Sequence, residues 1–198
     1  DMTTSTTFDL YMDRIARGDR LTPEEIHDLA TTPDILSLGM LADTLRRRLR
    51  DRRVTFLRVA EFAFDRPDVA GVPAAAREVR LTGSPADIES AVAAIEKTKS
   101  ISGDRTVAGF SWVDVDRWAA AAPLRQVLTR LKNAGLDAIA ELPLDHVGDP
   151  GFAAMSAKDA GFRQLRLTIG KAPADERTAL LIAASALQDV HGIVQSIN

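Results

Sequence analysis

The feature that most constrains this chain is an alternation of β-branched segments with amphipathic segments of helical length, which starts near residue 54. Strands are predicted at 54–59, 78–82, 106–111, 136–141, 162–169 and 193–197, and helices at 86–99, 113–120, 123–134, 151–160 and 173–190. Strands that alternate with helices indicate βαβ units and a parallel sheet covered by helices. The chain is therefore expected to be an α/β protein.

Two architectures suit about six such units: an open doubly wound sheet and an incomplete (β/α) barrel. A doubly wound sheet that binds a dinucleotide carries a Gly-rich turn after its first strand. Here that turn reads EFAFDRP (61–67), and neither GxGxxG nor a GxxxxGKS or GxxxxGKT motif occurs in the chain. The sequence thus favours an incomplete barrel of about six parallel strands with an N-terminal helical extension.

The extension is predicted to contain three helices before the first strand. Thr22 and Glu25 have the spacing of a capping box, and Pro23 suits the first helical position. The third helix, 34–50, ends in a run of arginines that complements the negative end of the helix dipole. We expect residues 1–53 to pack as a helical extension on a barrel formed by residues 54–198, the whole being one compact domain.

Composition excludes several partners and chemistries. Lys and Arg total 25 against 28 Asp and Glu, for a net charge of −3, which argues against nucleic acid. No run of about 18 apolar residues occurs, and the polar start of the chain lacks the apolar core of a secretory signal. We therefore expect a cytoplasmic protein with no membrane partner. The chain has no cysteine, which excludes disulfides, Cys-bound zinc and thiolate-ligated iron–sulfur clusters.

In a barrel, functional side chains gather at the carboxyl ends of the strands. Candidates for acid/base catalysis there are Glu61, Glu141, Asp145 and His146. Candidates for ligand binding are Thr82, Ser84, Ser111, Trp112 and Lys171. Carboxylate and imidazole would also suit a single metal ion, but no metal site and no cofactor are predicted. The competing interpretation is that these polar residues cap helices and face solvent.

Six short segments occur in a recognisable order: LTPEE (21–25), LGMLADTLR (38–46), VTF (54–56), AGFSW (108–112), LKNAGLD (131–137) and ALQDVHG (186–192). In that order they resemble the futalosine-pathway branch of the radical SAM family, which includes aminofutalosine synthase and dehypoxanthine futalosine cyclase. The resemblance covers most of the chain and implies the scaffold of that family.

The family's defining motif is missing. Its members carry CxxxCxxC after the first strand, and these cysteines hold the iron–sulfur cluster that binds S-adenosylmethionine. The corresponding stretch here is RVAEFAFDR (58–66), in which FAF (62–64) resembles the family's CAF, with Phe62 where the family has its last cysteine. Cleavage of S-adenosylmethionine by the family's mechanism is thus excluded for this sequence, and the resemblance implies scaffold and ancestry.

From these observations we expect a non-catalytic radical-SAM-like protein that acts as a binding or partner subunit in menaquinone or futalosine-type metabolism. The chain ends after the sixth strand, where the family continues, which predicts exposed strand edges that a protein partner or a second copy would cover. One alternative is a cluster-free lyase, isomerase or hydrolase that uses the four catalytic candidates. Another is binding of S-adenosylmethionine or a nucleoside without cleavage.

Overall fold

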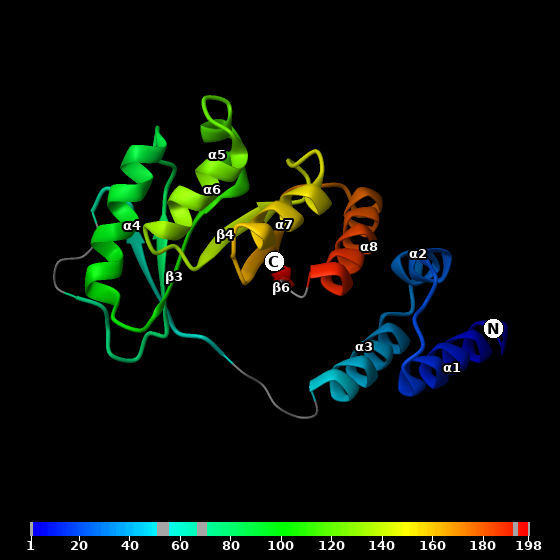
Figure 1. The fold of residues 1–198 in the computed structure, drawn as a ribbon. Helices are drawn as coiled ribbons and strands as arrows, with labels where there is room; N and C mark the ends of the chain where they lie inside the picture. Colours follow the sequence, from blue (N-terminus) through cyan, green and yellow to red (C-terminus); the bar gives the residue numbers. More distant parts are fainter. Residues whose placement is uncertain (1, 51–55, 67–70, 192–193, 198) are drawn as a thin grey trace. The chain divides into compact units, whose positions relative to one another are not determined.

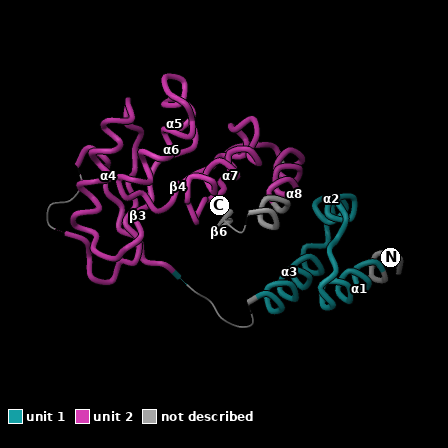
Figure 2. The backbone as a smooth tube through the Cα atoms, in the orientation of Figure 1, with its two compact units in different colours: residues 1–56 teal, residues 57–198 magenta. Residues whose placement is uncertain are grey.

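A computed structural model describes residues 2–50, 56–66, 71–191 and 194–197. The chain divides into two compact units, residues 1–56 and residues 57–198 (Figure 2). The first unit contains helices α1 (Met2–Arg17), α2 (Pro23–Thr31) and α3 (Ile35–Arg50). The boundary predicted at residues 53 and 54 lies outside the described residues, and packing of the helices on the barrel stays a prediction.

A small apolar cluster holds the first unit together. Phe8, Tyr11 and Ile15 of α1 are buried with Leu41 of α3. The predicted capping box at the start of α2 is confirmed: Glu25 N–H donates to Thr22 Oγ1 over 3.3 Å, and Thr22 N–H donates to Glu25 Oε2 over 2.7 Å. An ion pair between Arg14 and Glu25 joins α1 to α2.

The described part of the second unit forms a six-stranded sheet and five helices, and Figure 1 shows them as ribbons. Its strands are β1 (Val59–Ala63), β2 (Glu78–Thr82), β3 (Thr106–Ser111), β4 (Ala138–Pro143), β5 (Gln164–Thr168) and β6 (Val194–Ile197). Its helices are α4 (Ile88–Ser102), α5 (Trp112–Ala119), α6 (Leu124–Asn133), α7 (Pro150–Asp159) and α8 (Ala174–His191). All strands are parallel and follow one another in chain order. This order is that of a (β/α) barrel, whereas a doubly wound sheet reverses its order. The predicted fold class is confirmed.

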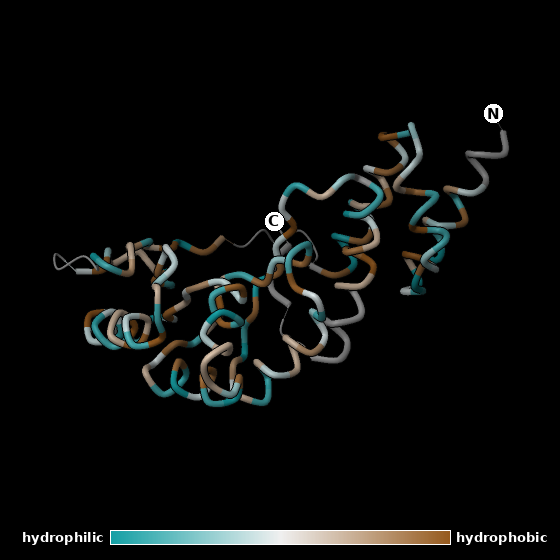
Figure 3. The backbone as a smooth tube through the Cα atoms, turned by 90° about the horizontal axis from the view of Figure 1, so that it is seen from above, coloured by the Kyte–Doolittle hydropathy of each residue, from teal (hydrophilic) through white to brown (hydrophobic). Residues whose placement is uncertain are grey.

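One face of the sheet, here called the outer face, packs against the helices. Successive side chains of a strand point to opposite faces, and the outer face carries the buried residues Leu81, Val107, Ile139, Leu165 and Leu167. These pack in one cluster with Ala91 and Ile95 of α4 and Leu128 and Leu131 of α6. Figure 3 shows hydrophobic and hydrophilic residues interspersed along the backbone. Among the described helices, none is long and apolar enough to cross a membrane.

The first strand lies further along the chain than predicted. The β-branched residues at 54–55 are outside the described part, 56–58 are not in a strand, and β1 begins at Val59. Its limits coincide with its pairing to β2, from Val59 opposite Glu78 to Ala63 opposite Thr82. Strand limits depend more on the available neighbour than on β-propensity. Glu61 consequently lies in the middle of the strand and not after it.

Helix α4 begins at Ile88, two residues later than the predicted start at residue 86. The cap is Asp87, whose Oδ1 accepts from the N–H of Ser90 over 2.7 Å. Aspartate and serine are equally suitable caps, and the hydroxyl of Ser84 donates instead to Asp114 of α5. Ser84 is therefore left at the carboxyl end of the sheet, beside the candidate site.

Candidate functional site

The face of the sheet opposite the helices, here called the inner face, carries the polar side chains. On β2 these are Glu78, Arg80 and Thr82, and on β5 they are Gln164, Arg166 and Thr168. The strands between them present small residues, with Ala108 of β3 paired in register with Ala138 of β4. This alanine floor leaves room for the long side chains of β2 and β5 to meet.

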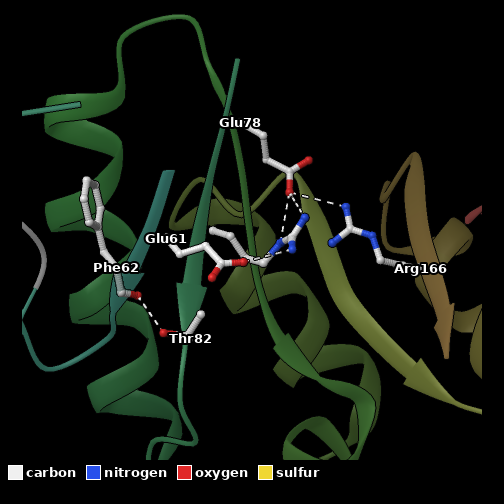
Figure 4. Close-up of polar contacts among 6 residues, drawn as sticks. Glu61, Phe62, Glu78, Thr82 and Arg166 are labelled. Carbon is white, nitrogen blue, oxygen red and sulfur yellow. Dashed lines mark hydrogen bonds and ion pairs between the residues drawn. The ribbon is translucent and has the colours of Figure 1, made fainter. Parts of the chain in front are cut away.

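The two strands meet through a buried carboxylate. Glu78 is only 2% exposed, and its Oε1 accepts from Arg80 Nη2 over 2.8 Å and from Arg166 Nη2 over 3.3 Å (Figure 4). Arg80 Nη1 also donates to Oε1 of Glu61 on β1 over 3.2 Å. A buried carboxylate is tolerated only when charged donors compensate its lost hydration. The network thus couples β1, β2 and β5 across the inner face.

A pocket of about 600 Å³ opens on this face, toward the carboxyl ends of the strands. The polar residues that line it are Arg80, Thr82, Ser84, Ser111, Asp114, Arg117, Glu141, Arg166 and Thr168. Three of the five predicted ligand-binding residues, Thr82, Ser84 and Ser111, are among them. Lys171 is exposed in the loop after β5 and does not line this pocket. Trp112 is buried in the hydrophobic core as the first residue of α5 and presents no surface to a ligand.

The rim of the pocket is fixed by Asp114. Its Oδ1 accepts from Ser84 Oγ and, over 2.9 Å, from Arg117 Nη2, while its Oδ2 accepts from the N–H of Ser111 over 3.1 Å. Arg117 Nη2 donates further to the carbonyl of Pro85 over 2.6 Å. The loop after β2 is therefore tied to α5, so the rim does not depend on a ligand for its shape.

Phe110 marks the end of β3 at this pocket. It is the only described non-glycine residue with positive φ, at 62°, a conformation that few residues with a side chain adopt. Its ring packs edge-on against Trp118, with centroids 5.6 Å apart. Backbone strain of this kind is common at functional sites. Together with the pocket, it marks this end of the sheet as the candidate site.

The four catalytic candidates do not form one cluster. Glu61 pairs with Arg80, and Glu141 accepts from Thr168 Oγ1 over 3.1 Å. The side chain of Asp145 is 8% exposed, and its Oδ2 accepts a hydrogen bond from the N–H of Gly170 over 2.9 Å. The side chain of His146 is 69% exposed, and its Nε2 lies 3.9 Å from Asp145 Oδ2. Only Asp145 and His146 are thus brought together. Within the described ranges, no three His, Asp or Glu residues are grouped as a metal site would require.

Sequence reasoning missed the three arginines of the pocket: Arg80, Arg117 and Arg166. A signal was present, because β2 reads EVRLT and β5 reads QLRLT. In both strands a polar residue, an arginine and a threonine alternate with apolar residues, so the three polar groups share one face. Charged residues are rare in the middle of buried parallel strands. An arginine at the same place in two such strands therefore indicates an inner face with a polar site.

The residues after β1 do not fit an iron–sulfur cluster of the radical SAM type. Phe64 stands there half-buried, packed so closely on Gly83 that a Cβ at that glycine would lie 2.9 Å from its ring. Asp65 and Arg66 follow, both exposed. With no cysteine in the sequence, these side chains offer aromatic, carboxylate and guanidinium groups in place of thiolates.

Comparison with known proteins gives a fold but no close relative. No family model matches the chain, and no curated protein matches it. Among solved structures it is similar to methylornithine synthase (PylB), with a TM-score of 0.60 and 14% identity over 89% of this chain. It is also similar to HydG, a maturase of the [FeFe]-hydrogenase, with a TM-score of 0.62 and 14% identity over 98% of this chain. The matched regions span 64% and 53% of those proteins. These neighbours show the fold alone, that of a partial (β/α) barrel.

Proposed function

We propose that this chain is a non-catalytic radical-SAM-like protein that works by binding, with a small polar molecule held in the inner-face pocket. We further propose, from the resemblance of its segments, that it serves as a binding or partner subunit in futalosine-type menaquinone metabolism. The observation that carries the proposal is the inner-face pocket, whose arginines Arg80 and Arg166 form ion pairs with Glu78. The cysteines that would bind an iron–sulfur cluster are absent from the sequence.

The pocket has donors left over for a ligand. Within the described part of the chain, Arg80 donates three hydrogen bonds, two to Glu78 and one to Glu61. Arg166 donates one side-chain hydrogen bond there, to Glu78. A guanidinium has five N–H donors, so most of those on Arg166 remain available at the pocket wall. On β4, Glu141 supplies a carboxylate that, among the described residues, accepts a hydrogen bond only from Thr168. Donors and acceptors together suit a ligand that has both.

Substitution of Arg166 tests the pocket. The melting temperature of the full chain is measured with S-adenosylmethionine and with adenosine, and calorimetry follows for either compound that raises it. We expect Arg166→Met to weaken the binding at least tenfold, a loss of about 1.4 kcal/mol. Arg130→Met is the control, because Arg130 pairs with Glu89 away from the pocket. No shift with any compound, or an equal loss in both variants, would contradict the proposal.

Reconstitution tests the non-catalytic half. The protein is incubated anaerobically with iron and sulfide, desalted, and assayed for both elements and for reductive cleavage of S-adenosylmethionine. We expect neither bound cluster nor cleavage. A stoichiometric cluster held by other side chains would overturn this part of the proposal.

A second candidate function rests on Asp145 and His146. Asp145 Oδ1 is buried and has no hydrogen-bond partner among the described residues. A buried orphan acceptor costs free energy unless a donor reaches it, and the neighbouring imidazole is of the kind used in acid/base catalysis. A cluster-free lyase, isomerase or hydrolase would lose its turnover in His146→Ala and keep it in His27→Ala, whereas a binding protein would show no difference in ligand affinity.

A further inference from the structure

Two arginines of the pocket wall share one buried carboxylate. Nη2 of Arg80 and Nη2 of Arg166 both donate to Oε1 of Glu78, over 2.8 and 3.3 Å, and the side chain of Glu78 is 2% exposed (Figure 4). Because they share one oxygen atom, the two guanidinium groups are close neighbours on the inner face. Two positive charges are thus set against one negative charge in this buried part of the wall.

The other carboxylates around the pocket do not supply the second negative charge. Asp114 already has an arginine partner at the rim. Glu61 pairs with Arg80 over 3.2 Å, and its side chain is 58% exposed, so that water screens its charge. Glu141 lines the pocket and accepts from a threonine, but among the described residues no ion pair joins it to Arg166.

Arg166 is therefore the group without a carboxylate of its own. Its side chain lines the pocket and is only 17% exposed. Within the described ranges it donates a single side-chain hydrogen bond, to Glu78. A guanidinium group that has lost most of its hydration is stabilised by an anion that takes the place of the water. The unused donors of Arg166 thus favour a negatively charged ligand.

We propose that the ligand of the inner-face pocket is a small carboxylic acid whose carboxylate binds the unused donors of Arg166. This inference rests on the proposed binding function and names the class of molecule that is bound. The planar fork of a guanidinium group matches a carboxylate through two parallel hydrogen bonds. One negative charge suffices, because one arginine lacks a partner, and a phosphate dianion would be repelled more strongly by Glu141 in the same wall.

Glu61 competes with such a ligand for the paired arginines. Its Oε1 accepts from Nη1 of Arg80, the guanidinium group that neighbours Arg166. The negative charge of Glu61 therefore lowers the positive potential that attracts the carboxylate of the ligand. Neutralising Glu61 should strengthen the binding of an acid and leave the binding of a neutral molecule unchanged.

Thermal shift and calorimetry with gluconate and sorbitol test the charge of the ligand. The two probes share a hydroxyl-bearing carbon chain, and only gluconate carries a carboxylate. We expect gluconate to bind the full chain, and sorbitol and inorganic phosphate to bind at least about tenfold more weakly. Arg166→Met is expected to abolish the preference for gluconate, whereas Arg130→Met keeps it, because Arg130 pairs with Glu89 away from the pocket.

The outcomes separate this inference from the binding function on which it rests. If adenosine or sorbitol binds through Arg166 and gluconate does not, the binding function stands and the acid is refuted. Tighter binding of phosphate than of gluconate also refutes the acid. If none of the probes binds, the binding function is contradicted together with the acid.

Glu61→Gln tests the competition through a gain of binding, which a misfolded variant would not show. We expect its affinity for gluconate to rise about two- to fivefold, with no change for sorbitol. Glu89→Gln is the matched control, since Glu89 is similarly exposed and pairs with Arg130 over 2.9 Å. An unchanged or weaker affinity in Glu61→Gln, or an equal gain in Glu89→Gln, would overturn the competition that the proposal requires.

Discussion

The two faces of the sheet are built from the same strands but differ in chemistry: the outer face is apolar and the inner face is charged. On the outer face, Leu81, Ile139 and Leu167 are buried among helices in one continuous apolar cluster. On the inner face, Glu78, Arg80 and Arg166 form ion pairs beside a pocket. The comparison shows that alternate residues of one strand can be specified independently, one set by packing and the other by charge. The outer face defines the fold, and the inner face determines what the fold can bind.

The largest expected effect is at Glu78, where the inner face behaves like a core. Glu78→Leu leaves two arginines without their shared carboxylate, and loss of one partner of a buried ion pair costs about 3 to 5 kcal/mol. The free energy of unfolding in urea measures this. If the free energy of unfolding falls by less than about 1 kcal/mol, the network contributes as little as a surface ion pair. The inner face would then not stabilise the fold as a core does.

The next largest effect is on the outer face. Leu167→Ala removes a fully buried side chain and is expected to cost about 3 kcal/mol, because a cavity remains in the packed cluster. Ligand affinity should be unchanged at temperatures where the variant is folded, since Leu167 does not line the pocket. A weakened affinity in calorimetry would mean that the two faces are not independent.

Arg166→Met is expected to change the free energy of unfolding by less than about 1 kcal/mol, although it weakens ligand binding. Glu78 keeps two contacts from Arg80 in this variant, so its charge remains compensated. Urea unfolding of Arg166→Met beside Glu78→Leu sharpens the comparison within the inner face. A loss as large as that of Glu78→Leu would show that Arg166 is a structural residue and not a ligand-binding one.

The smallest effect concerns a carboxylate on the helical layer. Partial desolvation raises the pKa of Asp116, an exposed residue of α5, above its ordinary value of 3.8, an effect that a hydrogen bond from Trp112 partly offsets. Because the folded state holds this proton more tightly, the stability that Asp116 contributes is greatest in acid and falls as the pH rises through its raised pKa. Asp116→Asn should therefore raise the melting temperature slightly at pH 7 and not below pH 3.8. A gain that persists in acid would contradict this cause.

Much of the outer face could be predicted from the sequence. The alternation of apolar residues in 78–82 and the apolar run within 106–111 predict β2 and β3 with the limits that the structure shows. The limits of β1 could not be predicted in the same way, because they depend on where β2 begins and not on the residues of β1 alone. Local pattern thus determines a strand only where its own side chains carry the signal.

The inner face was less predictable because its contacts join distant parts of the chain. Thr82, Ser84, Ser111 and Glu141 were expected at the strand ends and line the pocket. The pairing of Glu78 with Arg166 could not be read from either segment, since it depends on the alanine floor that separates their strands. Trp112 was a candidate for ligand binding, with packing as the competing interpretation, and its place at the start of α5 puts it in the core.

The order of the strands bears on how such a chain is made. Each strand hydrogen-bonds to the one synthesised just before it, so a growing polypeptide always finds its neighbour already in place, and the sheet can extend during translation. The contact between Glu78 and Arg166, 88 residues apart, is different, because it forms only after β5 has emerged. That late contact would hold β2 and β5 together across the inner face.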